Sequence, residues 1–372
     1  MSKTLLYTQL YESLRNQILS GMLVEGSKLP TEHELVEQFK ISRVTVNKAM
    51  GLLVDEGLIT RSPRNGSFVK AAGNLKKGFT MGGYNGLIGL IISSYAGISG
   101  GMFVDSVINE AYQRGFSAML GIYKDSPSME AKYIDMQIKS GAKGFVIIPH
   151  VDEHYNRDML RYLIDGFPIV FADKYIDGIS APYVGSKNEE AVIQAANHLF
   201  ELGHTHIAFA TLSLGATSLS EREKGFLTAY AMTDFRYSPE HIIKDIECTM
   251  SSYLTPEYKR KDVERLKAFF TNHPEVTGLI CSYPSILRTA EIAAAEVGYR
   301  IPYDISLLCF DAPGDLLDQD QYTHIIQNWQ GMAEHSVSML CDVLNGDTSS
   351  NHILLDTRLH IGRSTGPVSE NR

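Results

Sequence analysis

The sequence has few cysteines and a single tryptophan among its 372 residues. Cys248, Cys281, Cys309 and Cys341 form no C-x-x-C pair and lie in or beside apolar stretches, which indicates small buried thiols. This spacing argues against a disulfide framework and against the usual zinc sites. We therefore expect no structural metal and no cofactor.

Long apolar runs are also missing. A helix needs about 20 consecutive apolar residues to cross a bilayer, and no run in this chain approaches that length. The N-terminus carries Lys3, Glu12 and Arg15 where a secretory signal would be apolar. These features predict a cytoplasmic protein that has no membrane partner.

Two common catalytic motifs are absent as well. The sequence contains no glycine loop for phosphate and no His-Glu-x-x-His helix. His204 and His206 have the spacing of a metal pair, but they directly precede an apolar strand, where a turn is the better interpretation. An enzyme is therefore not the favoured class.

Charge is distributed unevenly along the chain. The whole chain has a net charge of −9, yet residues 1–70 hold nine Lys or Arg against seven Asp or Glu, which leaves −11 for the remainder. An acidic body repels nucleic acid, so only the N-terminal part is a candidate DNA-binding surface.

The first 70 residues have the pattern of a winged helix-turn-helix. An amphipathic run over 6–19 predicts a first helix, and Thr31-Glu32-His33-Glu34 forms a capping box for a second. Ser42 is placed to cap a third helix that ends at Gly57. Residues 58–69, "LITRSPRNGSFV", then predict a hairpin that turns at Asn65-Gly66.

The rest of the chain alternates between short apolar runs and amphipathic helices. Residues 71–86 contain five glycines and predict a flexible linker. From residue 87 the alternation predicts two doubly wound, parallel-sheet lobes, whose ligands bind beyond the carboxyl ends of the strands. The expected strands of the first lobe are "LIGLII", "FSAMLGIY", "GFVII" and "PIVFA", which closes that lobe, and those of the second lobe are "HIAFA", "TGLICS" and "ISLLCF".

Two family resemblances follow from these motifs. The segment "KLPTEHELVEQFKISRVTVNKAMGLLVDEGLITRSPRNGSFV" resembles the DNA-binding domain of the GntR family. Residues 87–365 resemble the effector domain of the LacI/GalR family, which is similar to periplasmic sugar-binding proteins; the matching segments are "HLFELGHTHIAF", "REKGF", "GYRIPYDISLLCFD" and "HIIQ". Such a head on such a body is the arrangement of the arabinose repressor group.

The GntR resemblance implies a set of DNA-binding residues. Arg43 is placed for a bidentate contact to guanine, while Asn47 stands where the family commonly has arginine and is suited to adenine. Arg64 replaces a first wing glycine and is expected in the minor groove. The full set is Tyr7, Thr31, Glu32, Ser42, Arg43, Thr45, Asn47, Lys48, Arg64, Asn65 and Gly66.

The LacI resemblance implies a sugar-binding cleft. Arg222 matches the family's sugar-binding arginine and Asp311 its acceptor carboxylate, whereas Tyr283-Pro284 replaces a common Asn-Asp pair. Charged planar groups and an aromatic ring are the side chains that sugars require. The full set is Tyr95, His150, Asp173, Arg222, Tyr283, Asp311 and Gln327, with Trp329 interpreted either as a cleft residue or as a buried interface residue.

Together these features predict a sugar-responsive transcriptional regulator. We expect a homodimer that binds a pseudo-palindromic operator as a repressor and is released by a small sugar, arabinose or another monosaccharide such as fucose. A co-repressed or activating regulator of the same architecture remains the alternative. A periplasmic carrier is disfavoured by the winged helix, and a simple nucleic-acid binder by the cleft residues.

Overall fold

The computed structural model divides the chain into two compact units, Met1–Tyr84 and Asn85–Arg372. It describes residues 6–19, 23–24, 26–55, 57–62, 66–70, 85–94, 97–150, 157–212, 215–247, 256–314, 319–347, 349 and 351–369, to which all structural statements refer. Within these residues, no helix combines the length and hydropathy that a membrane span requires.

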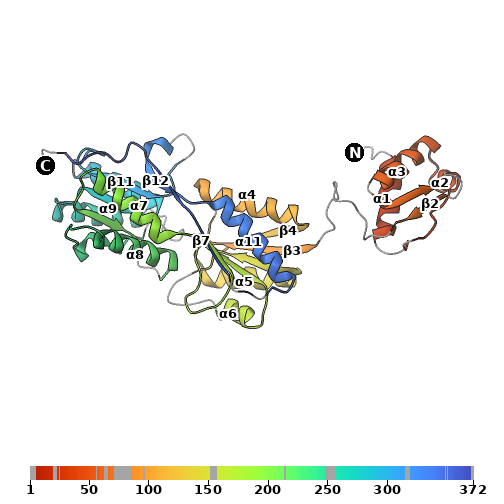
Figure 1. The fold of residues 1–372 in the computed structure, drawn as a ribbon, viewed down its shortest axis with the longest axis horizontal. Coiled ribbons are helices and arrows are strands. Elements are labelled where there is room, and N and C mark those ends of the chain that lie inside the picture. Colours follow the sequence, from red (N-terminus) through yellow and green to blue (C-terminus); the bar gives the residue numbers. More distant parts are fainter. Residues whose placement is uncertain are drawn as a thin grey trace. The chain divides into compact units, whose positions relative to one another are not determined.

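The N-terminal unit is a winged helix-turn-helix, as the sequence predicts. Its elements are α1 (Leu6–Leu19), α2 (Glu32–Phe39), α3 (Arg43–Asp55) and the antiparallel strands β1 (Ile59–Ser62) and β2 (Gly66–Val69) (Figure 1). The capping box is confirmed: the Glu34 backbone N–H donates to Thr31 Oγ1 at 3.3 Å, and the Thr31 N–H donates to the Glu34 carboxylate at 2.6 Å. Both contacts satisfy backbone groups that a helix end leaves unpaired.

One small apolar core holds this unit together. Leu10 and Leu14 from α1, Leu35 from α2 and Val46 and Leu53 from α3 are all buried in it. Since α1 and α2 both pack on α3, they fix the position of α3 while its first turn stays at the surface.

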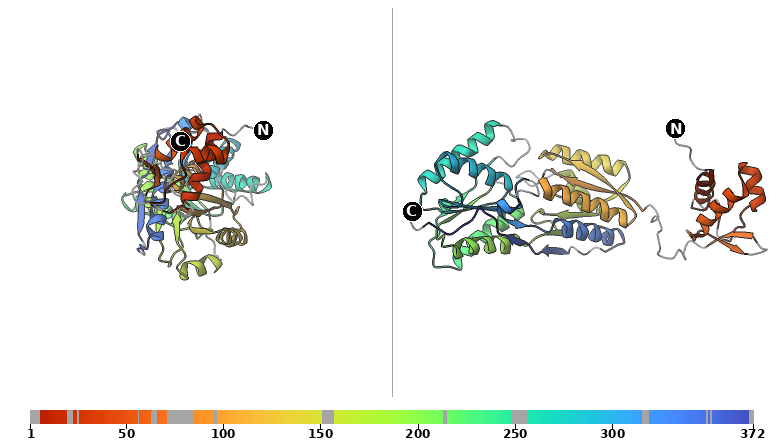
Figure 2. Two further views of the ribbon diagram at one scale, coloured as in Figure 1. Left: turned by 90° about the vertical axis from the view of Figure 1, so that its right-hand side faces the viewer. Right: turned by 90° about the horizontal axis from the view of Figure 1, so that it is seen from above.

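The first lobe of the second unit is built on a six-stranded parallel sheet in the order β13-β7-β6-β5-β3-β4. Helices α4 and α11 cover one face and α5 and α6 the other (Figures 1 and 2). Alternate residues of a strand face opposite helices: Val146 packs with α4 and α11, whereas Phe145 and Ile147 pack with α5 and α6. The elements are β3 (Gly86–Ile92), α4 (Gly97–Gln113), β4 (Phe116–Ile122), α5 (Pro127–Lys139), β5 (Ala142–Ile147), α6 (Arg157–Ile164), β6 (Ile169–Ala172), β7 (Tyr183–Ser186), α11 (Trp329–Leu344) and β13 (His352–Leu355).

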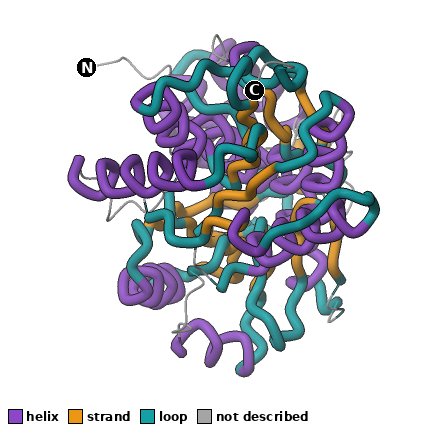
Figure 3. The backbone as a smooth tube through the Cα atoms, turned by 90° about the vertical axis from the view of Figure 1, so that its left-hand side faces the viewer, coloured by secondary structure: helices purple, strands orange, loops and turns teal. Residues whose placement is uncertain are grey.

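The second lobe repeats this plan in the order β14-β12-β11-β10-β8-β9, in which only β14 runs antiparallel. Helices α9 and α10 cover one face and α7 and α8 the other, so the strands lie between helices (Figure 3). The elements are α7 (Asn188–Glu201), β8 (Ile207–Ala210), α8 (Thr217–Ala231), η2 (Pro239–His241), β9 (Ile242–Ile243), α9 (Pro256–Asn272), β10 (Gly278–Cys281), α10 (Pro284–Glu296), β11 (Ser306–Phe310), η4 (Gln319–Gln321), β12 (Thr323–Ile326) and β14 (Arg358–His360).

The two doubly wound, parallel-sheet lobes confirm the predicted fold class, but the chain divides itself between them differently from the sequence interpretation. "PIVFA" does not complete the first lobe, because β7, α11 and β13 also belong to it. The chain crosses between the lobes after β7, after β12 and after β13. Residues at these crossings, among them Ser186 and Gln327, therefore lie at the hinge.

Candidate DNA-reading face and effector cleft

The first turn of α3 presents its side chains outward. Ser42 caps the helix, as predicted: the Thr45 backbone N–H donates to Ser42 Oγ at 3.1 Å, and the two hydroxyl oxygens lie 2.8 Å apart. The Arg43 side chain is 78% exposed, and Val44 is exposed beside it. This is the presentation that a recognition helix requires in the major groove.

A carboxylate on α2 organises the outward polar groups of α3. Glu32 Oε2 accepts from Arg43 Nε at 3.0 Å and from Asn47 Nδ2 at 3.3 Å, and Glu32 Oε1 accepts from Arg61 on β1. The hydrogen bond from Arg43, assisted by Arg61 and Asn47, outweighs desolvation and lowers the pKa of Glu32. The carboxylate therefore stays charged at neutral pH and sets the directions of two predicted base-reading side chains.

Arg61 is a member of this face that the sequence analysis did not identify. Its guanidinium also donates to Asn47 Oδ1 at 2.9 Å, so both ends of the Asn47 amide are engaged. A hollow of about 630 Å³ brings Thr31, Glu32, Arg43, Arg61 and Gly66 to one surface. Arg61 is recognisable as a member of this face only when the wing hairpin is known to pack against α2 and α3.

Tyr7, Lys48 and Gly66 are further predicted DNA-binding residues that the structure describes. Lys48 Nζ lies 4.0 Å from the centre of the Tyr7 ring, which is a cation–π contact. Gly66 has a φ of +102°, and a Cβ there would come within 2.8 Å of Lys28 Cε, so a side chain would be strained. Arg64 and Asn65 lie outside the described residues.

The second unit has a cleft of about 290 Å³ between its lobes. It lies beyond the carboxyl ends of the strands, where parallel α/β sheets bind ligands. Four predicted effector residues line it, namely His150, Asp173, Tyr283 and Asp311, together with Trp329. Tyr95 lies outside the described residues.

Asp311 is the polar centre of the second lobe's wall. Its carboxylate accepts from Gln327 Nε2 at 2.8 Å and from Trp329 Nε1 at 3.1 Å. Trp329 starts α11 and packs edge-on against Phe103 with 5.9 Å between ring centres. One carboxylate thus joins the strand end of the second lobe to a helix of the first.

Arg222 lies behind this wall and does not line the cleft. Its side chain is buried, 3% exposed, and donates to Asn188 Oδ1 at 2.9 Å, to the Ser282 carbonyl at 2.8 Å and to Gln327 Oε1 at 3.3 Å. Its guanidinium stacks over the Phe310 ring at 3.6 Å. The structure thus places this residue in the hinge network rather than at the cleft surface.

Gln327 completes that network. While its amide nitrogen donates to Asp311, its oxygen also accepts from Ser186 Oγ at 3.0 Å. It is buried between the lobes at a crossing of the chain. Gln327 therefore bonds to groups from β7 in the first lobe and from α8 and the end of β11 in the second.

Two aspartates follow strands in left-handed backbone conformations. Asp173 after β6 has a φ of +64° and Asp311 after β11 a φ of +54°. Such conformations are strained for most residues and concentrate at functional sites. Desolvation raises the pKa of Asp173, against the opposing field of Arg222 and Lys174.

The cleft also contains residues that the sequence analysis missed. Ser93 after β3 and Asp125 after β4 are hydrogen-bonded to each other, and Lys174 follows Asp173. The strand-end rule that selected Asp311 points equally to Ser93 and Asp125. His150 is buried, and its ring packs edge-on to Tyr123 with 5.9 Å between centres.

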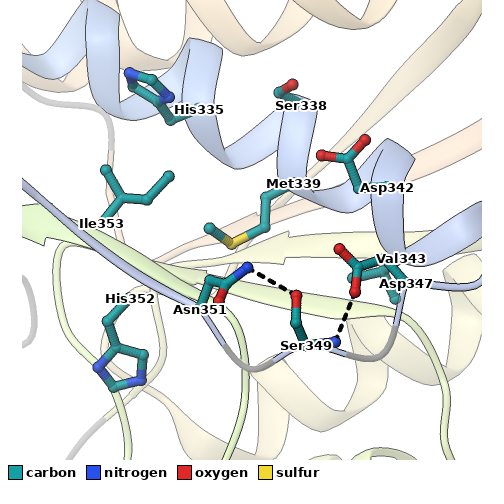
Figure 4. A pocket seen from close by; sticks show the side chains of 10 residues that line it. All are labelled: His335, Ser338, Met339, Asp342, Val343, Asp347, Ser349, Asn351, His352 and Ile353. Atoms are coloured by element: carbon teal, nitrogen blue, oxygen red, sulfur yellow. Dashed lines mark hydrogen bonds between the residues drawn. The ribbon is translucent and has the colours of Figure 1, made fainter.

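Another hollow, of about 480 Å³, lies on the first lobe between α11 and the segment that precedes β13 (Figure 4). Its polar groups include His335, Asp342 and His352, while Ser349 and Asn351 are hydrogen-bonded to each other at 2.7 Å. None of the residues predicted for the effector site lines it.

Family models match segments in both units. The model "Bacterial regulatory proteins, gntR family" matches residues 6–69, and "Periplasmic binding protein-like domain" matches residues 196–365. The "Arabinose metabolism transcriptional repressor" of Geobacillus stearothermophilus is 25% identical over 312 residues, which cover 82% of this chain and 81% of that protein. The "HTH-type transcriptional repressor NagR" of Bacillus subtilis is 47% identical over 64 residues, 17% of this chain and 26% of that protein.

Solved structures share the fold of the second unit. The transcription regulator CcpA of Lactococcus lactis aligns with a TM-score of 0.65 at 16% identity, covering 75% of this chain and 98% of that one. A LacI family transcriptional regulator from Enterococcus faecium, crystallised with bound ribose, aligns with a TM-score of 0.62 at 18% identity, covering 76% and 100%.

The winged helix and the two-lobed body with its cleft define a DNA-binding transcriptional regulator. More particularly, residues 6–69 match the gntR-family helix-turn-helix domain, and residues 196–365 match a periplasmic-binding-protein-like domain.

Proposed function

We propose that this protein is a homodimeric repressor of sugar-utilisation genes that a small sugar releases from its operator. The observation that carries the proposal is the cleft, where a charged acceptor, an indole and a phenol from both lobes converge. The relatives named as arabinose repressors support a pentose such as arabinose, with fucose or another monosaccharide as further candidates.

The chemistry of the cleft suits a polyhydroxy ligand. Asp125, Asp173 and Asp311 offer carboxylate acceptors, Lys174 offers a donor, and Tyr283 and Trp329 offer ring faces. Sugars bind through paired hydrogen bonds to charged groups and through packing of their apolar face on a ring. The small volume of about 290 Å³ favours one monosaccharide over an oligosaccharide.

The hinge supplies the proposed route of signalling. A ligand that bonds to Asp311 competes with Gln327 and Trp329 for the same carboxylate and draws the lobe walls together. Lobe closure then changes the geometry of the dimer and the spacing of its two DNA-binding heads. By linkage, operator DNA must weaken sugar binding by the same factor.

A thermal-shift screen identifies the effector. Among arabinose, fucose, ribose, xylose, galactose and glucose, the true effector should raise the melting temperature in a concentration-dependent manner. The same screen with a variant that lacks the Asp311 carboxylate separates cleft binding from nonspecific stabilisation. If no monosaccharide shifted the melting temperature of the parent chain at millimolar concentration, the sugar-effector proposal would be wrong.

Asn47 is the residue we expect to distinguish this protein's operator from those of its relatives. Replacing it with arginine should move the preferred base at one half-site position from adenine towards guanine, because asparagine pairs with adenine and arginine with guanine. A panel of half-sites that vary one base at a time measures the change. An unchanged preference at every position would contradict this role.

One face of α4 is the surface we propose for dimer pairing. Ile108 and Tyr112 are four residues apart and so share one face of α4, and both are exposed, with Tyr112 at 69%. Adjacent exposed apolar side chains of this kind mark protein contact sites. Tyr112→Asp should raise the dimer dissociation constant at least tenfold in sedimentation equilibrium. Met136→Asp, which changes an exposed residue of α5, is the matched control. If Met136→Asp weakened the dimer and Tyr112→Asp did not, the face of α4 would not be the dimer interface.

A further inference from the structure

Two histidines and a glutamate meet at the amino end of the second lobe's sheet. His241 directly precedes β9, His273 follows α9, and Glu275 lies shortly before β10. Parallel strands place their amino ends along one edge, whereas Tyr283 and Asp311 follow the carboxyl ends of β10 and β11. The cluster and the effector cleft therefore occupy opposite ends of one sheet.

The spacing of the three side chains is that of metal ligands. Glu275 Oε1 lies 3.4 Å from His241 Nε2 and 3.3 Å from His273 Nδ1. Both separations exceed the usual N–H···O range of about 2.7–3.2 Å. A tetrahedral ion with bonds of about 2.1 Å keeps its ligand atoms about 3.4 Å apart.

The local structure holds these side chains in place. His241 is 2% exposed, and its backbone N–H donates to the Ser238 carbonyl at 3.0 Å. The His273 ring lies against Phe269 with 4.7 Å between ring centres, and its backbone N–H donates to the Phe269 carbonyl at 2.9 Å. Because the two histidines are already held in place, their side chains lose little conformational entropy when an ion binds.

We propose that His241, His273 and Glu275 bind one divalent transition-metal ion, with Zn²⁺ as the best match. Two imidazoles and one carboxylate suit Zn²⁺ and its neighbours, whereas Mg²⁺ and Ca²⁺ prefer oxygen ligands throughout. Three protein ligands leave a fourth position for water. The ion ties β9 to the connection between α9 and β10 and so stabilises the second lobe without touching the cleft.

His241 lies 34 positions before Glu275 in the sequence. No motif signals such a site, which is why the sequence led us to expect no metal. Folding of β9 beside β8, and of β10 on the other side of β8, brings the three groups together.

Metal titration of the full chain tests this proposal. After treatment with EDTA and dialysis, calorimetry with Zn²⁺ should show one strong site per chain, and Co²⁺ should give the visible absorption of a tetrahedral complex. His273→Gln and Glu275→Gln should each weaken Zn²⁺ binding at least tenfold and remove the Zn²⁺-dependent rise in melting temperature. His335→Gln, at an exposed histidine of α11, is the control and should behave as the parent.

His273 and Glu275 are chosen for substitution because they are at least partly exposed. His241 is buried, and we expect His241→Gln to destabilise the fold. Circular dichroism of each apo variant against the apo parent verifies that its fold is intact. If the parent bound no Zn²⁺, or if both variants kept the parent's affinity and stoichiometry, the cluster would not be a metal site. Sugar and operator binding are measured separately, so failure here leaves the proposed function unaffected.

Discussion

Arg43→Ala should lower operator affinity by about 100-fold or more. A bidentate arginine–guanine contact contributes about 1–3 kcal/mol, and a dimer loses that contact at both half-sites. Arg43 is exposed at the first turn of α3, where Glu32 directs its guanidinium. Fluorescence anisotropy with a duplex selected by the protein from a randomised pool measures the loss.

Two comparisons make this result specific. Arg300→Ala removes another exposed arginine that has a carboxylate partner, Asp304, but it lies in the second unit and should leave operator affinity unchanged. Arg43→Ala should also relax the preference at one base position, whereas loss of a phosphate contact weakens binding to all sequences alike. A uniform loss across all half-sites would assign Arg43 to the phosphate backbone instead.

Asp311→Asn should weaken effector binding by about 100-fold while leaving operator affinity without effector within twofold of the parent. Hydrogen bonds to a charged group contribute roughly 1.5–3 kcal/mol each, and the substitution removes the charge that receives them. Asparagine tolerates the left-handed backbone that residue 311 adopts, so the fold should persist. The variant should therefore act as a repressor that no longer responds to its sugar.

The control for this variant is Asp165→Asn, which neutralises an exposed carboxylate beyond α6 and away from the cleft. Isothermal titration with the sugar found in the thermal-shift screen gives both affinities. If Asp311→Asn bound that sugar within threefold of the parent, Asp311 would not be an effector ligand.

The N-terminal domain was predictable in detail because its signals are local. The Thr31–Glu34 capping box and the Ser42 cap each act within one helical turn, so sequence spacing is enough to find them. The part played by Arg61 depends on packing of the wing against α2 and α3, which no local pattern encodes. Glu32 was selected from the sequence, but its place at the centre of the polar network was not.

The two-lobed body was predictable in class but not in connectivity. Alternating apolar runs and helices indicate parallel sheets. The return of α11 and β13 to the first lobe, however, is determined by tertiary packing and not by a local sequence pattern. Short strands such as β9, with two residues, carry almost no periodic signal.

The cleft illustrates the same limit. The strand-end rule located Asp173 and Asp311 at its wall, and the family resemblance pointed to Tyr283. Arg222 also matches the family pattern, but its hydrogen bonds to Asn188 and Gln327 at the hinge hold its side chain behind the cleft wall. No sequence pattern encodes that position.

The most direct test of the central claim is operator affinity measured with and without the effector sugar. The full-length protein is titrated onto its selected duplex at fixed salt, first alone and then with saturating arabinose or whichever sugar the screen identifies. We expect the sugar to weaken operator binding at least tenfold, and the operator to weaken sugar binding by the same factor. Operator binding that was unchanged or tightened by a sugar occupying the cleft would contradict the account.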